Sequence, residues 1–256
     1  MISVVILGAG NVGTHLVRAV QAAENLELIQ WYSRNPKAIK FPIKGIEFCH
    51  DLDRLKLADV YIIAVSDKAI SELSKQLPFE NRLVVHTSGS VAIKQLDKKQ
   101  RRGVFYPLQT FSLTSEVAFS DVPICIETMQ KEDSKFLKTL ASEMGSPSYM
   151  INTEQRQALH LSAVFINNFT NQLYRIAHEL SDYKNINFDV LKPLILETAK
   201  KVQTISPYNA QTGPAKRNDQ VTIKQHLRTL ETHPEYKSIY ELLTKSIKNT
   251  HGFKKL

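Results

Sequence analysis

The sequence predicts an α/β domain with a parallel sheet, followed by an all-helical domain, and three observations support this prediction. A short apolar run at the N-terminus leads into three closely spaced glycines and then into a helix-forming segment. Strand-like and helix-like segments alternate up to residue 151, which is typical of βαβ units with right-handed crossovers. Beyond residue 151 no strand-like segment remains. We therefore expect an α/β domain over residues 1–151 and a helical domain over residues 152–256.

The glycines follow the first predicted strand, residues 2–7, in the order Gly8-Ala9-Gly10-Asn11-Val12-Gly13. In a strand–turn–helix unit with G-x-G-x-x-G spacing, the first glycine makes the turn and the second lets the backbone approach a pyrophosphate. The third lets the helix pack close to the strand. The helix N-terminus then offers free N–H groups to the phosphates. We expect a Rossmann-like dinucleotide site that uses Gly8, Gly10, Asn11, Val12 and Gly13.

The remaining elements are predicted from apolar runs, periodicity and turn residues. Further strands are expected at 26–32, 46–49, 59–65, 82–86, 103–108, 123–127 and 148–151, and helices of the first domain at 14–23, 66–76 and 131–144. Asn152 and Gln155 suit a capping arrangement for a long helix that continues to about residue 180. Later helices are expected at 188–203, 219–230 and 232–248.

The end of the second strand indicates which dinucleotide is preferred. A site for NAD usually carries an acid about 20 residues past the glycines, which binds the ribose 2′-hydroxyl. This chain has Ser33 and Arg34 there and no acid. Both residues can donate hydrogen bonds to a 2′-phosphate, which favours NADP over NAD. The alternative is a surface turn, because the residues of Ser-Arg-Asn-Pro are also common in turns.

Two further strand ends carry polar residues at the edge of the sheet where ligands bind. We expect Val65, Ser66 and Thr87 to contact the cofactor, and Ser66 is also suited to cap the next helix. His86 is a candidate proton donor near the nicotinamide, and the alternative is a hydrogen-bonded structural histidine.

The long helix carries a polar stripe beside an apolar one. His160 and Asn167 are seven residues apart and share a face, and Asn168 lies on the flank. These three residues are candidates for catalysis, and the alternative is a satisfied polar layer or a solvated face. Because the rest of the helix is apolar nearly all round, we expect it to be buried against a second subunit, which makes the helical domain the predicted homodimer contact.

A polar loop at residues 211–219 precedes another helix. Its Lys216 and Arg217 are suited to hold a carboxylate, so a small and anionic substrate is one expectation. The predicted substrate-binding residues of this loop are Gln211, Thr212, Lys216 and Arg217. Capping of the following helix accounts for Asn218 or Asp219 but not for the dense polar loop before them.

Composition narrows the function classes. The net charge is +8, of which residues 1–151 hold +2 and residues 152–256 hold +6. An anionic cofactor, substrate or nucleic acid fits this charge, and so does a solvated basic surface. No nucleic-acid motif is visible, which makes nucleic acid an unlikely partner. Cys49 and Cys125 show no metal-ligand spacing, so no metal is expected, and without a secretion or membrane segment we expect a cytoplasmic protein.

Taken together, the motifs resemble one bacterial family of two-domain, Rossmann-like proteins. They read G-A-G-N-V-G, A-V-S-D, H-T-S-G, Y-P-L-Q-T-F, H-L-S-A-V-F-I-N-N and Q-T-G-P-A-K-R-N-D, and they cover nearly the whole chain. The family is provisionally described as NADP oxidoreductases, related to the deazaflavin-dependent kind, with a C-terminal domain of unknown function. The resemblance implies hydride transfer between NADP and a small carbonyl, imine or hydroxy compound.

More distantly, the layout is similar to pyrroline-5-carboxylate reductase and the β-hydroxyacid dehydrogenases, whose helical domains often dimerise. The hydroxyacid dehydrogenases use a lysine and an asparagine four residues later on the long helix. This chain has no lysine on that helix between Thr153 and Leu180. His160, Asn167 and Asn168 are the residues of this helix most similar in chemistry to that catalytic pair. The missing lysine also motivates an alternative function, a regulatory or scaffold protein that binds NADP and catalyses nothing.

Overall fold

In a computed structural model, which describes residues 1–35 and 46–252, the chain divides into two compact units. The first unit is Met1–Asn168 and the second is Phe169–Leu256. The boundary expected from the sequence lies near residue 151. The first unit extends further than this and includes the start of the long helix. Each unit is described by itself below.

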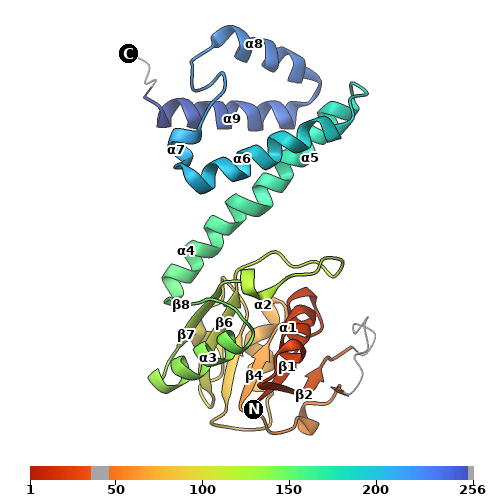
Figure 1. The fold of residues 1–256 in the computed structure, drawn as a ribbon, viewed down its shortest axis with the longest axis vertical. Helices are drawn as coiled ribbons and strands as arrows, with labels where there is room; N and C mark the ends of the chain where they lie inside the picture. The colour runs from red at the N-terminus through yellow and green to blue at the C-terminus, as the bar shows by residue number, and fades with distance from the viewer. Residues whose placement is uncertain (36–45, 253–256) are drawn as a thin grey trace. The chain divides into compact units, whose positions relative to one another are not determined.

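The first unit is built on an eight-stranded sheet with the order β3-β2-β1-β4-β5-β6-β7-β8 (Figure 1). The strands are β1 (Ile2–Leu7), β2 (Leu26–Tyr32), β3 (Glu47–Cys49), β4 (Val60–Ile63), β5 (Leu83–His86), β6 (Arg101–Pro107), β7 (Ile124–Thr128) and β8 (Ser148–Met150). The chain order reverses between β1 and β4, which is the switch point where open α/β sheets bind ligands. The predicted α/β class and the Rossmann-like sheet are confirmed.

One strand pair corrects the prediction of a parallel sheet. β6 and β7 are antiparallel, with Pro107 opposite Ile124, whereas the other neighbouring pairs are parallel. No α-helix separates β6 from β7; the described connection holds only a 3₁₀ turn, Phe119–Asp121. β7 thus begins at the end of the sheet where β6 finishes, whereas β5 and β6, also joined without an α-helix, are parallel.

Helices cover both faces of this sheet. Side chains of α1 (Asn11–Ala22) and α3 (Lys131–Glu143) share one hydrophobic core with Val4 and Ile6 of β1. Figure 1 shows both helices in front of the sheet. The opposite core joins Val5 and Leu7 to α2 (Asp67–Lys75). Burial on both faces explains why the central strands are apolar along their whole length.

The long helix begins with the predicted capping box, because the Asn152 side chain accepts from Gln155 N–H and the Gln155 side chain accepts from Asn152 N–H. It then departs from the prediction of one regular helix. It consists of α4 (Thr153–Ala163), a π-helical segment (Val164–Phe169) and α5 (Thr170–Asp182). The boundary between the two units falls inside the π-helical segment.

The second unit is helical throughout its described residues, as predicted. It contains α5, α6 (Lys192–Thr204), α7 (Pro207–Ala210), α8 (Gln220–Thr229) and α9 (Pro234–Thr250), with short 3₁₀ turns at Phe188–Leu191 and Leu230–Thr232. Only a few of its apolar side chains are buried, among them Ile176, Ile223 and Leu230. No helix within residues 1–35 and 46–252 is long and apolar enough to cross a membrane.

Candidate functional site

The glycine turn after β1 has three glycines in three different environments. Gly8 has a φ of +128°, and a Cβ there would lie 2.2 Å from the Ala64 carbonyl oxygen. A Cβ on Gly13 would lie 2.3 Å from the Gly8 carbonyl oxygen, so α1 packs directly against the turn. At Gly10 a Cβ would meet no heavy atom within 4 Å. Gly8 and Gly13 therefore serve the fold, whereas Gly10 leaves open space that a pyrophosphate fits.

A cleft runs along the carboxyl ends of the parallel strands on both sides of this turn. One cavity of about 260 Å³ and another of about 510 Å³ share Gly8, Ala9, Val65 and Ser66. The smaller cavity is also lined by Tyr32, Ser33, Arg34, Asn35, Ala69, Glu72, Leu73 and Gln76. The larger is also lined by Gly10, Asn11, Val12, Ala64, Asp67, Thr87, Ser88, Gly89, Tyr106 and His160. The cleft thus brings together the predicted cofactor residues, with Gly13 packed beneath the turn.

The end of the cleft beside β2 contains the predicted 2′-phosphate residues. Ser33 is buried and its hydroxyl donates its proton to the Asn35 carbonyl oxygen at 2.9 Å, so it must turn away from Asn35 before it can donate to a phosphate. Arg34 is exposed and lines the same cavity. This end of the cleft therefore offers a cation, with the Ser33 hydroxyl beside it.

At the other end of the cleft, the tip of β6 meets α4. The Tyr106 hydroxyl and His160 Nδ1 are 3.1 Å apart, and the two rings meet edge to face. A Cβ on Gly89 would lie 2.6 Å from His160 Nδ1 and 2.8 Å from Tyr106 Cζ, so glycine is needed for the pair to pack on the turn after β5. Burial raises the pKa of the Tyr106 phenol to about 12, which keeps it protonated at neutral pH.

His86 lies at the end of β5 but lines neither cavity. It is fully buried, and its Nδ1 accepts from Ser88 N–H at 3.2 Å while its Nε2 has no partner. Burial, aided by the nearby Arg156 charge, lowers the pKa of His86 to about 3. A histidine in this state is uncharged at neutral pH and supports the turn at Thr87–Gly89.

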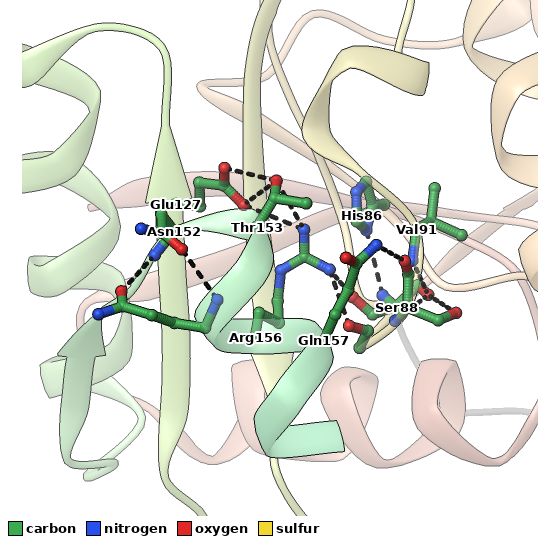
Figure 2. Close-up of polar contacts among 11 residues, drawn as sticks. His86, Ser88, Val91, Glu127, Asn152, Thr153, Arg156 and Gln157 are labelled. Carbon is green, nitrogen blue, oxygen red and sulfur yellow. Dashed lines mark hydrogen bonds and ion pairs between the residues drawn. The ribbon is translucent and has the colours of Figure 1, made fainter. Parts of the chain in front are cut away.

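A buried ion pair holds that turn against the long helix (Figure 2). Arg156 has no exposed surface, and its Nη2 lies 3.0 Å from a carboxylate oxygen of Glu127. Its Nη1 donates to the Ser88 and Gly89 carbonyl oxygens at 2.9 and 3.0 Å. Gln157 adds a bond to the Ser90 carbonyl oxygen at 2.8 Å. These contacts fix α4, and with it His160, relative to the strand ends.

Beyond Tyr106 and His160 lies a third cavity of about 380 Å³, which those two residues also line. Asn167 and Asn168, which lie in the π-helical segment, both line it. Neighbouring residues of the regular helix α4 do so too, so the cavity lies along a broad face of the long helix. The remaining lining residues are Leu108, Gln109, Thr110, Leu159, Ser162, Ala163, Val164 and Ile166.

The predicted substrate loop belongs to the second unit. Lys216 Nζ donates to the Gln211 carbonyl oxygen at 2.8 Å and so closes the loop on itself. Asp219 accepts from Thr222 N–H and caps α8. The substrate role of Gln211, Thr212, Lys216 and Arg217 stays a prediction. Among residues 1–35 and 46–252 there is no group of three or more His, Cys, Asp or Glu side chains placed to hold a metal ion.

Sequence reasoning missed two residues of this region, Tyr106 and Arg156. Tyr106 stands near the end of a predicted strand, in Y-P-L-Q-T-F, so the rule that ligands bind at strand ends would have found it. Nothing in the sequence indicates that Arg156 is buried, because its ion-pair partner Glu127 lies 29 positions away and no motif spacing connects the two residues.

Comparisons with known proteins connect this cleft to a family. Residues 3–89 match the family described as NADP oxidoreductase, coenzyme F420-dependent, and residues 122–247 match a domain of unknown function, DUF2520. A solved structure from Bacteroides fragilis, provisionally described as an NADP oxidoreductase, is 39% identical, with 97% of this chain and 98% of that one covered and a TM-score of 0.86. This chain belongs to that NADP oxidoreductase family. The predicted family resemblance is therefore confirmed.

Two more distant structures share the fold of this oxidoreductase family member. A protein from Thermotoga maritima is 18% identical, with 97% of this chain and 98% of that chain covered and a TM-score of 0.74. A pyrroline carboxylate reductase from Plasmodium falciparum, solved with NADP bound, is 11% identical, with 98% of both chains covered and a TM-score of 0.62. No curated protein matches the sequence.

Proposed function

We propose that this protein transfers a hydride between NADP and a small carbonyl, imine or hydroxy compound, with Tyr106 and His160 handling the proton. The observation that carries the proposal is the continuous cleft, which runs from the Gly10 turn to the hydrogen-bonded Tyr106–His160 pair. Gly10 and the N-terminus of α1 are suited to the pyrophosphate, and Thr87–Gly89 border the far end. Family membership supports the same reaction class.

When bound, NADP supplies or accepts the hydride. The chain's own part is to place the substrate oxygen beside the Tyr106 hydroxyl and to move one proton. During reduction of a carbonyl, the Tyr106 O–H proton passes to that oxygen while the carbon gains the hydride. In the tautomer that carries its proton on Nδ1, the half-buried His160 returns that proton to Tyr106 while its Nε2 takes one from solvent, so the imidazole stays neutral. The Tyr106 phenol is protonated at neutral pH and so has a proton to donate; its raised pKa makes it a weaker acid than an ordinary tyrosine, and the hydrogen bond with His160 is the contact that supports its role.

The activity test uses purified protein, NADPH and a panel of neutral and acidic carbonyl compounds, imines and oxidised coenzyme F420. We expect substrate-dependent NADPH oxidation. Tyr106→Phe should lower kcat by roughly 100-fold or more, the usual contribution of a general acid, with NADPH affinity unchanged. His160→Gln should lower kcat while Tyr106 remains in place. NADPH binding without oxidation across the whole panel would instead support the non-catalytic, regulatory alternative.

We propose that NADP is preferred over NAD because Ser33 and Arg34 line the cleft beside β2. Arg34→Ala should weaken NADPH binding by roughly 10-fold, the loss of a hydrogen bond to a charged group, and should leave NADH binding unchanged. Arg82→Ala, which removes an arginine directly before the start of β5 and so away from the carboxyl ends of the strands, is the matched control. Equal losses for the two dinucleotides would contradict the assignment of the 2′-phosphate to Arg34.

We also propose that the protein is a homodimer that covers the apolar face of its long helix. Leu161, Phe165, Ile166 and Phe169 are large apolar side chains of this helix, and they are 58%, 61%, 76% and 49% exposed in the single chain. Monomeric proteins rarely expose such a run. The sequence predicted burial of this helix, and a second copy would provide it.

Sedimentation velocity tests the dimer. Phe165→Glu should shift the wild-type dimer to monomer, because the variant buries a charge at the proposed contact. Met129→Glu is the control, since Met129 is also an exposed apolar residue but follows β7. A wild-type monomer at high protein concentration would overturn the proposal.

A further inference from the structure

The cavity beyond the Tyr106–His160 pair has a distinctive chemical character. None of the described residues that line it is Lys, Arg, Asp or Glu. Its polar groups are the Tyr106 hydroxyl and the His160 imidazole, two amides on the π-helical segment, and the side chains of three further residues. The two amides are Asn167 and Asn168, and the three further residues are Gln109, Thr110 and Ser162. Its volume of about 380 Å³ lies in the range of small-molecule sites.

Two charged groups of the first unit act near the Tyr106–His160 pair, and neither is a free cation. Both Nη atoms of Arg156 are occupied by Glu127 and by the carbonyl oxygens of Ser88 and Gly89. Asp67, which lines the adjoining cofactor cleft, is an anion and accepts a short hydrogen bond from the Ser90 hydroxyl. Neither group therefore offers a positive charge to a carboxylate beside Tyr106.

This lining offers a carboxylate no lysine or arginine, so a bound carboxylate would exchange part of its hydration for neutral hydrogen-bond donors and the His160 imidazole alone. A carboxamide, hydroxyl or ester loses less hydration, and the amide and hydroxyl side chains of the cavity can replace its hydrogen bonds. We propose that the cavity takes a neutral, hydrogen-bonding carbonyl compound rather than a carboxylate. This substrate class rests on the proposed oxidoreductase function, and it departs from the anionic substrate that Lys216 and Arg217 suggested from sequence.

Matched pairs of substrates test the class directly. Each pair is a keto acid and its primary amide, for example 2-oxobutanoate with 2-oxobutanamide and 4-oxopentanoate with 4-oxopentanamide, assayed with the NADPH-loaded protein. We expect kcat/KM to be roughly 10- to 100-fold higher for the amide, which corresponds to one poorly satisfied charged group. Equal rates, or a preference for the acid, would overturn the proposal.

A substitution that places a positive charge in the cavity wall provides a second, independent test of the substrate class. Gln109 is exposed, and its side-chain oxygen accepts from Thr110 N–H at 2.8 Å, so a lysine fits there without burial. Gln109→Lys should raise acid turnover relative to amide turnover by roughly 10-fold or more, because it supplies the missing cation. Gln109→Met, of similar length and without charge, should not change the ratio. An unchanged ratio in Gln109→Lys would count against this cavity as the substrate site.

Binding separates failure of the substrate class from failure of the reaction. Titration calorimetry of the NADP-loaded protein measures both members of each pair without turnover. Amide binding that exceeds acid binding, with no oxidation of NADPH, would uphold the neutral class and refute the proposed reaction. Turnover of the acids or of coenzyme F420, with the amides inert, would uphold the reaction and refute the class. If neither member binds up to its solubility limit, the cavity is not a site for such carbonyl compounds and the inference fails.

Discussion

Replacing each of the three glycines of the first turn by alanine should have different effects on stability and on NADPH binding. A Cβ on Gly8 would overlap the Ala64 carbonyl oxygen at 2.2 Å and would also require alanine at a φ of +128°. We expect Gly8→Ala to lower the free energy of unfolding by about 2–5 kcal/mol, from backbone strain and overpacking together. Gly13→Ala has the overlap without the positive φ and should lose about 1–3 kcal/mol.

Gly10→Ala should behave oppositely. Its Cβ meets nothing within 4 Å, so the free energy of unfolding should change by no more than about 0.5 kcal/mol. The same methyl group would occupy the space beside the pyrophosphate, and the Kd for NADPH should rise by roughly 10- to 100-fold, which is about 1.4–2.8 kcal/mol.

The chain contains its own reporter for this measurement. Trp31 is the single tryptophan; it is 1% exposed, and its Nε1 donates to the Gly8 carbonyl oxygen at 2.8 Å. Urea unfolding followed by tryptophan fluorescence therefore reports on the first unit, and titration calorimetry gives the affinity for NADPH. If Gly10→Ala loses as much stability as Gly8→Ala, or binds NADPH as tightly as the wild type, the division of roles among these glycines is wrong.

Three further predictions concern the support beneath the site. Arg156→Met should destabilise the first unit by about 3–5 kcal/mol in the same unfolding assay, because it leaves the Glu127 carboxylate without its partner, and adding Glu127→Gln should restore part of the loss. Since His86 is neutral when folded, with a pKa of about 3, its contribution to stability is full above pH 6.5 and falls by about 1.4 kcal/mol per pH unit below it; His86→Gln should flatten that slope. Gly89→Ala, whose Cβ would push into the His160 ring, should lower kcat while NADPH affinity is retained, and an unchanged kcat would contradict the need for close packing there.

Much of the first unit could be predicted because its signals are local. The apolar run at β4 is buried on both faces, and the glycine spacing marks the turn from β1 into α1. Ser33 and Arg34 line the cleft because the end of β2 is placed there by the sheet order. In each case a short segment carries a pattern that is typical of the Rossmann-like fold, although the contacts that hold it, such as Gly8 with Ala64, are long-range.

What escaped prediction depends on contacts between distant segments. Two successive strand-like runs without an α-helix between them leave their relative direction open, since β5 and β6 are parallel whereas β6 and β7 are antiparallel. The π-helical segment, which contains Asn167 and Asn168, was not predicted from composition or periodicity. The Tyr106–His160 contact joins residues 54 positions apart.

That contact also changes how the missing lysine is interpreted. In the hydroxyacid dehydrogenases, which this chain resembles in layout, a lysine on the long helix serves the chemistry. Here the corresponding helix contributes His160, and the proton-bearing group beside it is Tyr106, from the tip of a strand. A phenol with a pKa of about 12 is neutral before it donates its proton, so it does not attract a carboxylate as a lysine would. The replacement of a cation by a neutral donor and the uncharged wall of the adjoining cavity therefore favour the same substrate class. If Tyr106→Phe abolished turnover of an acid and its amide equally while the wild type preferred the acid, this connection between the donor and the substrate would be refuted.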